Sequence, residues 1–171
     1  MNNNQNDSQL DEDIAKALQI LDEGGVVGMP TETVYGLAAR IDRPQALDKI
    51  FNIKRRPYFD PLIVHVSDIA MAKRYCAHWS AVSEALAKHF WPGPLSLVVK
   101  KNALESDYVP QVVTAGLDTV ALRMPNHPAA LRLIAGCKTG LAAPSANIFG
   151  RTSPTQYQHV VQEFGGKVFV I

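Results

Sequence analysis

The sequence lacks the motifs that mark several common enzyme classes. It has no G-x-x-x-x-G-K-[ST] phosphate loop, no G-x-G-x-x-G segment, no H-E-x-x-H pair and no G-x-S-x-G elbow. These absences argue against P-loop nucleotidases, Rossmann dinucleotide enzymes, zinc peptidases of the H-E-x-x-H type and α/β-hydrolases. Any catalysis must therefore use other polar segments of the chain.

Cysteine and net charge are also scarce. Cys76 and Cys137 are the only two cysteines and form no C-x-x-C pair, which argues against a zinc site or a redox motif and suits a reducing compartment. The formal net charge is +1, whereas proteins that bind nucleic acid mainly through phosphates usually carry a strong basic excess. We therefore expect weak or no direct binding of nucleic acid.

Long hydrophobic runs are absent as well. No stretch approaches the ~18 apolar residues of a membrane-spanning helix. The first residues, MNNNQNDSQ, have neither the basic nor the apolar region of a secretory signal. We expect a cytoplasmic protein with no membrane association, in which residues 1–9 form a mobile polar tail.

The remaining pattern predicts one α/β domain over residues 10–171. A helix is expected to start at Leu10, capped by Ser8 and Asp11, and to stop at Gly24-Gly25. Further helices are expected from about 44, at 67–75, 80–90, 128–135 and 156–164, and strands at 26–29, 62–66, 95–100, 120–124, 141–143 and 168–171. Helices and strands alternate without a regular βαβ repeat, which predicts a mixed sheet.

Polar segments follow several of these strands, where open α/β sheets bind their ligands. The first is PTETVYGLA (residues 30–38), either a functional loop or a turn whose threonines satisfy local backbone groups. The second contains Lys54 and Arg56, which would project to one side of an extended segment before Pro57 and form a phosphate or carboxylate clamp. The alternative is a helix end that carries cations.

Two further segments have the same ambiguity. His65 and Arg123 lie in apolar strands, where each is either a satisfied structural residue or a ligand-binding one. The last segment, LAAPSANIFGRTSPT (residues 141–155), offers hydroxyls and amides in a loop shaped by glycine and proline. Such a loop can cradle an anion, but it can also be a capped loop before the last helix.

Taken together, six segments resemble the threonylcarbamoyl-AMP synthase (YrdC-like) family, in order and over about residues 10–171. They are PTETVYGL, K-x-R-P, PLIVH, WPGPLS, VALRMPNHP and PSANIFGRTSPT. The resemblance implies a twisted mixed sheet with helices around a large polar cavity. It also implies that the chain continues past its last strand in the natural protein, into a segment that supplies a further arginine to ATP.

The resemblance implies three groups of site residues. Threonine would be held by Thr33, His65, Arg123 and the backbone of Ala143. The triphosphate would face Lys54 and Arg56, the residues expected to be catalytic, with Asp60 nearby where the family usually has asparagine. The nucleotide would contact Thr119, Ser145 and Ser153, in a loop shaped by Asn147.

The implied reaction condenses L-threonine, bicarbonate and ATP, with Mg²⁺ on the phosphates, and hands its product to the tRNA threonylcarbamoyl-transferase machinery. It needs no covalent nucleophile, in keeping with the missing motifs. Three alternatives stay open at this point. They are a carbamoyl-phosphate-using domain of hydrogenase maturation, a double-stranded RNA-binding module and an inactive interaction subunit.

Overall fold

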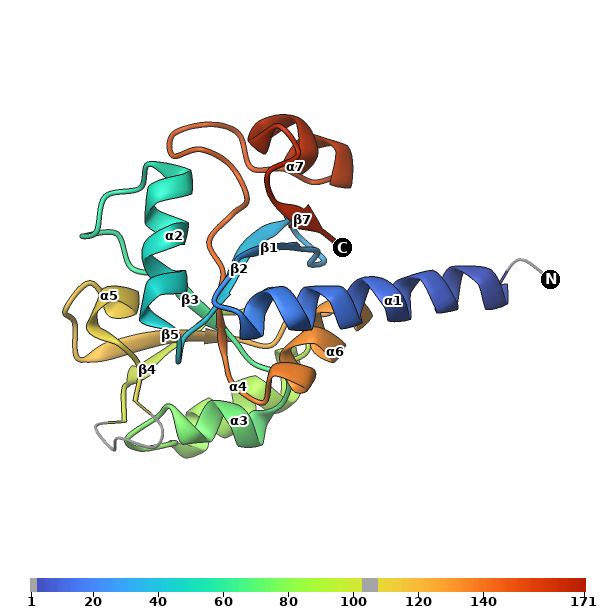
Figure 1. Ribbon diagram of the computed structural model, residues 1–171. Coiled ribbons are helices and arrows are strands. Elements are labelled where there is room, and N and C mark those ends of the chain that lie inside the picture. Colours follow the sequence, from blue (N-terminus) through green and yellow to red (C-terminus); the bar gives the residue numbers. More distant parts are fainter. Residues whose placement is uncertain (1–2, 103–107) are drawn as a thin grey trace.

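The computed structural model describes residues 3–102 and 108–171, which form one seven-stranded sheet surrounded by helices (Figure 1). The helices are α1 (Asn3–Asp22), α2 (Pro44–Lys54), α3 (Ile69–Arg74), α4 (Ala81–Phe90), α5 (Gln111–Thr114), α6 (Pro128–Cys137) and α7 (Tyr157–Phe164). The strands are β1 (Val27–Met29), β2 (Gly36–Arg40), β3 (Ile63–His65), β4 (Leu97–Lys100), β5 (Thr119–Arg123), β6 (Leu141–Ala142) and β7 (Phe169–Val170).

The strand order is β4-β5-β3-β6-β2-β1-β7. The pairs β3–β5 and β1–β7 are parallel, and the other four pairs are antiparallel. The expected mixed sheet of an α/β protein is therefore confirmed.

The two faces of the sheet differ in how well helices and loops cover them. Leu37, Val64 and Leu122 are fully buried on one face, where each contributes roughly 1.5–3 kcal/mol by leaving water. Side chains alternate along a strand, so the neighbouring residues point to the other face. On that face Ile63 and Ala121 are only partly buried. This "open face" comprises Gly36, Ile63, His65, Thr119, Ala121, Arg123 and Ala143.

Helix α1 begins earlier than the sequence pattern predicts. It starts at Asn3, so the expected tail is largely helical, and residues 1 and 2 lie outside the described residues. The predicted cap at Ser8 is wrong, because no glycine or proline precedes Gly24 to interrupt the helix. The helix stops at the predicted place, where Gly24 has a positive φ of 73°. It packs beside α6, and its N-terminal end extends past the rest of the molecule (Figure 1).

Strand β2 is not predicted by the sequence pattern, although it pairs with both β1 and β6 near the middle of the sheet. Its sequence, GLAAR, is small and does not alternate. The small residues are needed by the packing, because a Cβ at Gly36 would lie 3.1 Å from the Cβ of Ala143. The short helix α5 is not predicted either, because its four residues are too few to show a helical repeat of apolar residues.

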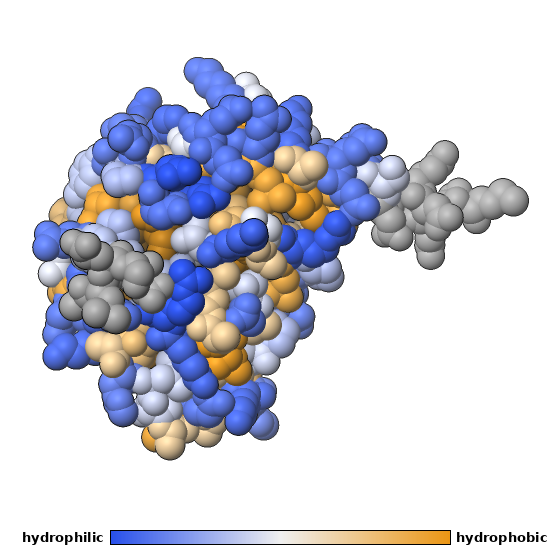
Figure 2. Space-filling view, turned by 60° about the horizontal axis from the view of Figure 1, so that its bottom comes forward, coloured by the Kyte–Doolittle hydropathy of each residue, from blue (hydrophilic) through white to orange (hydrophobic). Residues whose placement is uncertain are grey.

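No helix within residues 3–102 and 108–171 is long and apolar enough to cross a bilayer. Figure 2 shows one side of the molecule, on which hydrophobic residues form separate patches between hydrophilic ones. This side therefore has a mixed surface and not one broad apolar face.

Candidate active site

The turn after β1 is organised by the side chain of Thr31. Its Oγ1 donates to the carbonyl of Val34 at 2.6 Å and accepts from the backbone N–H groups of Thr33 and Val34 at 3.2 and 3.3 Å. The N–H of Ala146 donates to the carbonyl of Tyr35 at 2.7 Å, which ties this turn to the loop after β6. The turn thus places Thr33 at the rim of the open face.

Arg123 ends β5 beside this turn, and its side chain is about nine-tenths buried. Its Nη2 donates to Glu32 Oε1 at 2.8 Å and to Thr33 Oγ1 at 2.9 Å, and its Nε donates to the carbonyl of Gly93 at 3.3 Å. The other oxygen of Glu32 accepts from the N–H of Asn126 at 3.0 Å. The sequence left open whether Arg123 is a satisfied structural residue or binds a ligand. The structure shows that Arg123 forms an ion pair with Glu32.

Glu32 was given no role by the sequence argument. Burial alone would raise the pKa of Glu32, but the hydrogen bond and the charge of Arg123 outweigh it and hold the pKa below its ordinary value. Glu32 stays ionised and fixes the guanidinium of Arg123 in place. The only hint of a role in the sequence is that Glu32 lies in the polar run PTET. Its partner, Arg123, is 91 residues away in the sequence, so no local pattern could show the pair.

His65 ends β3 and lies next to Arg123, its register partner on β5. The ring is 3% exposed, and its Nδ1 is buried without a hydrogen-bond partner among the described residues. Burial, with the nearby charge of Arg123, lowers the pKa of His65 to about 4, so the ring is neutral at pH 7. A buried nitrogen without a partner costs roughly 1–3 kcal/mol, which makes His65 a candidate to receive a ligand group.

These residues surround a hollow of about 210 Å³ at the end of the open face. It is lined by Thr31, Val34, Gly36, Ile63, His65, Arg123, Ala143, Pro144 and Ser145. The volume suits a ligand smaller than the drug-sized molecules that fill pockets of ~300–1,000 Å³. The structure thus places His65, Arg123, Ala143 and Ser145 around this hollow, with Thr33 bound to Arg123 beside it, but the hollow does not confirm the expected large polar cavity.

The acid sensitivity of folding follows from the burial of His65. Its folded pKa lies below the ordinary value of 6.5, so between about pH 6.5 and 4 the unfolded chain binds a proton that the folded protein does not. We expect the free energy of unfolding to fall by roughly 2–3 kcal/mol across this window. Urea denaturation at several pH values measures it. The His65→Phe variant should show a flatter dependence, and an equal slope in both proteins would contradict the assignment.

Lys54 does not lie on an extended segment with Arg56, so the predicted one-sided projection is wrong. Helix α2 continues to Lys54, and Arg55 caps it in the left-handed conformation with φ of 52°. The Nζ of Lys54 donates to the carbonyls of Ser145 and Asn147, both at 2.5 Å, and the residue is 1% exposed. Burial, followed by the charge of Arg56, lowers the pKa of Lys54 to about 8, which leaves it mostly protonated at pH 7.

The loop after β6 is held from several sides besides Lys54. The side-chain amide of Asn147 donates to the carbonyls of Ile148 and Arg151 at 2.9 and 2.8 Å. Glu163 of α7, which the sequence argument did not identify, accepts from the N–H of Ile148 at 2.8 Å. Ser153 lies on a separate hollow of about 380 Å³, which also involves Asn147 and Glu163. Ser145 and Ser153 therefore face different hollows of the same loop.

Arg56 is bound by the residues that follow it in the loop between α2 and β3. Its Nε donates to the carbonyl of Asp60 at 3.2 Å, and its Nη2 donates to the carbonyl of Pro61 at 3.0 Å. The same Nη2 lies 2.9 Å from the Asp60 carboxylate. Arg56 thus compensates the charge of Asp60.

Thr119 begins β5, on the same face as Arg123 but four residues away. At ~3.3 Å per residue, the two are roughly 13 Å apart along the strand. The predicted site residues therefore spread along the open face instead of forming one cluster. Such a spread suits an extended ligand and not a single small molecule.

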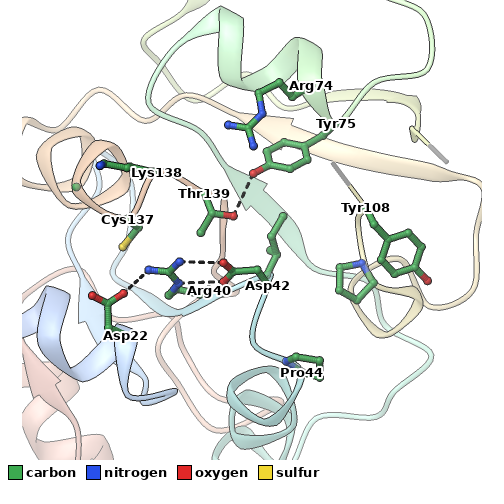
Figure 3. Close-up of a pocket in the computed structure, with 13 residues that line it drawn as sticks. Asp22, Arg40, Asp42, Pro44, Arg74, Tyr75, Tyr108, Cys137, Lys138 and Thr139 are labelled. Atoms are coloured by element: carbon green, nitrogen blue, oxygen red, sulfur yellow. Dashed lines mark hydrogen bonds and ion pairs between the residues drawn. The ribbon is translucent and has the colours of Figure 1, made fainter. Parts of the chain in front are cut away.

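A larger hollow of about 640 Å³ lies elsewhere, between the ends of α1, β2, α3 and α6 (Figure 3). Arg40 lines this hollow, where it pairs with Asp22 and, through two hydrogen bonds, with Asp42. These contacts raise the pKa of Arg40 and lower that of Asp42. The hydroxyl of Tyr75 donates to or accepts from Thr139 at 3.2 Å. These groups pair with one another, so this hollow is better explained by structure than by catalysis.

Histidine, cysteine and acidic side chains are the usual ligands of a resident metal ion. Within the described parts of the chain, no group of three or more histidine, cysteine or acidic side chains is arranged to hold a metal ion.

Comparisons with known proteins agree with this arrangement. The family model Sua5_yciO_yrdC, described as telomere recombination, matches residues 19–171. The threonylcarbamoyl-AMP synthase of Pyrococcus abyssi (strain GE5 / Orsay) is 48% identical over 146 residues, which cover 85% of this chain and 42% of that protein. The synthase of Bacillus subtilis (strain 168) is 44% identical over 161 residues, with 94% and 46% covered. The chain thus spans less than half the length of these relatives.

A solved structure gives the same result in three dimensions. The crystal structure of P. abyssi Sua5 complexed with L-threonine has a TM-score of 0.87 to this chain, with 46% sequence identity. The match covers 92% of this chain and 45% of that one. Fold, motif order and sequence identity agree, and the chain belongs to the Sua5/YciO/YrdC family.

Proposed function

We propose that this chain forms the substrate-binding face of an L-threonylcarbamoyladenylate synthase. The enzyme would condense L-threonine, bicarbonate or CO₂, and ATP into threonylcarbamoyl-AMP and pyrophosphate, for threonylcarbamoyladenosine modification of tRNA. The observation that carries the proposal is the buried Arg123, held by Glu32 and Thr33 at a hollow of about 210 Å³. Two relatives at 48% and 44% identity bear the name of this synthase, which supports the same conclusion.

Threonine fits the chemistry of this hollow. The Nε and Nη2 donors of Arg123 are used by Gly93, Glu32 and Thr33, which leaves Nη1 to donate a charge-assisted hydrogen bond to the amino-acid carboxylate. The hydroxyl of Thr33 and the unpartnered Nδ1 of His65 offer polar partners for the amine or the side-chain hydroxyl. Ala143 and Ile63 offer an apolar wall for the methyl group.

ATP would lie along the open face, from Ser145 towards Arg56 and Thr119. The amine of threonine adds to CO₂ and loses a proton, which gives a carbamate. A carbamate oxygen then forms a bond to the α-phosphorus, and the bond from that phosphorus to the bridging oxygen of pyrophosphate breaks. The protein would contribute positioning and cationic groups near the developing charge. Mg²⁺ would enter with ATP as part of the substrate.

Release of pyrophosphate tests the proposal directly. A synthase releases it from ATP only when threonine and bicarbonate are both present. A domain that uses carbamoyl phosphate, or a module that only binds double-stranded RNA, gives no such dependence. Absence of the joint requirement, in a protein shown to be folded, would overturn the proposal. We also propose that the product passes to a tRNA threonylcarbamoyl-transferase in the cytoplasm, with little direct contact between this chain and tRNA.

Replacing Arg56 by alanine is expected to weaken ATP use roughly 10- to 150-fold and threonine use much less. A hydrogen bond to a charged group is worth ~1.5–3 kcal/mol, and Arg56 would supply such bonds to the phosphates. The measurement is KM for each substrate by pyrophosphate release. Arg55→Ala is the matched control, because Arg55 is adjacent but exposed. Full activity of Arg56→Ala at limiting ATP would remove Arg56 from the site.

A further inference from the structure

Both arginines of the proposed site are already paired with carboxylates of the chain itself. Arg123 is paired with Glu32 at 2.8 Å, and Arg56 is paired with Asp60 at 2.9 Å. An anionic substrate that approaches either arginine meets a negative charge next to it. The consequence for the substrate depends on whether the carboxylate is fixed or can move.

Glu32 is fixed on both sides. One of its oxygens accepts from Arg123 and the other accepts from the N–H of Asn126, and its side chain is 20% exposed. A carboxylate with both oxygens engaged cannot swing away without losing two hydrogen bonds. Glu32 is therefore an orienting residue, which leaves the unoccupied part of the Arg123 guanidinium for a ligand.

Asp60 is held much less firmly. Its side chain is 36% exposed, and among the residues that the structure describes its carboxylate pairs only with Arg56. An ion pair that is this exposed to water is weak. Arg56 also makes two bonds that do not involve the carboxylate, to the backbone carbonyls of Asp60 and Pro61. Arg56 therefore keeps its direction even if the Asp60 carboxylate moves away or loses its charge.

From this contrast we infer that Asp60 is a displaceable internal competitor that sets the affinity of Arg56 for the phosphate chain of a nucleotide. The carboxylate occupies Nη2 of Arg56 in the free protein, and a polyphosphate must displace it or accept its repulsion. The inference rests on the proposed function, because that function places phosphates at Arg56. It goes beyond that function by making Asp60 the residue that limits ATP affinity and not one that supplies it.

The variant Asp60→Asn tests this inference. Asparagine keeps the size of the side chain and both backbone carbonyls that hold Arg56, and it removes only the charge. We expect about tenfold tighter binding of inorganic tripolyphosphate, since removing one like charge beside an anion has an effect of this order. The KM for ATP should fall by a similar factor, and the KM for threonine should not change.

Asp48→Asn is the matched control. Asp48 is an acid of α2 near the same loop, where it accepts a hydrogen bond from Tyr58 at 3.3 Å, but it does not contact Arg56. The same loss of charge at this position should change tripolyphosphate affinity less than twofold. Equal gains in both variants would show a general charge effect and would overturn the inference.

Calorimetric titration of tripolyphosphate, with EDTA and then with Mg²⁺, separates the remaining outcomes. Tighter binding of Asp60→Asn under both conditions supports the inference. Weaker binding in the presence of Mg²⁺ would make Asp60 a metal ligand, and unchanged binding would make it irrelevant; either result overturns the inference. Tighter tripolyphosphate binding without any threonine-dependent pyrophosphate release would leave the inference standing while the proposed synthase reaction fails.

Discussion

The Arg123→Ala variant is expected to lose about 10³-fold in kcat/KM for threonine, while the KM for ATP changes little. Truncating one partner of a buried, hydrogen-bonded charge pair costs ~2–5 kcal/mol of binding free energy, and this arginine is the main cation beside the hollow of the proposed amino-acid site. The loss should be the same for serine as for threonine, because both share the carboxylate that Arg123 would bind. Calorimetry with each amino acid measures the affinities.

The same change also threatens folding, since Arg123→Ala leaves the Glu32 carboxylate without its cation. A control is therefore needed to separate lost binding from lost structure. The double variant Arg123→Ala with Glu32→Gln removes both charges, and its stability in urea should recover most of the loss. Its threonine affinity should not recover. Unchanged threonine affinity in the folded single or double variant would exclude Arg123 from the amino-acid site.

Several elements could be predicted from the sequence because their signals are local. Ser80 caps α4 as predicted, with its hydroxyl accepting from the N–H of Ser83 at 3.0 Å. Strands β3 and β5 follow from short apolar runs, and the parallel pairing of β3 with β5 fits the expected mixed sheet. Local patterns therefore identified the elements that bear His65 and Arg123, but not the register that makes these two residues neighbours.

The rest of the site depends on contacts between distant parts of the chain. Glu32 and Arg123 are 91 residues apart, and Lys54 lies 91 and 93 residues from the two carbonyls that it binds. No periodicity within one segment can show such pairs. The resemblance to a family named the right segments, yet the structure alone shows that Lys54 binds the loop and that Arg56 is already paired.

The Lys54 result also shows why a two-residue spacing was misleading. The prediction required an extended backbone from Lys54 to Pro57, since only there do alternate side chains share a side. The helix instead continues to Lys54, and the left-handed Arg55 turns the chain. The two cations then separate, and Lys54 points into the protein while Arg56 turns towards Asp60 and Pro61.

The Lys54→Met variant is expected to lower the free energy of unfolding by about 3–5 kcal/mol. Methionine has a similar length but no donor, so the carbonyls of Ser145 and Asn147 lose a charge-assisted hydrogen bond each, worth ~1.5–3 kcal/mol. Lys49→Met is the matched control. Lys49 lies on the same helix and donates to the carbonyl of Gly24 at 2.7 Å, but at an exposed position. Its replacement should cost less than about 1 kcal/mol.

Urea denaturation of the two variants, together with tripolyphosphate titration, distinguishes a support for the loop from a direct phosphate ligand. A loop support predicts a large loss of stability, with ATP affinity reduced only through the displaced loop. A phosphate ligand predicts the reverse, because a side chain that binds substrate contributes little to folding in its absence. If Lys54→Met folds as stably as Lys49→Met and binds tripolyphosphate 10-fold or more weakly, the Lys54 ammonium must turn from the loop to the phosphates when ligand binds, and the loop-support assignment is wrong.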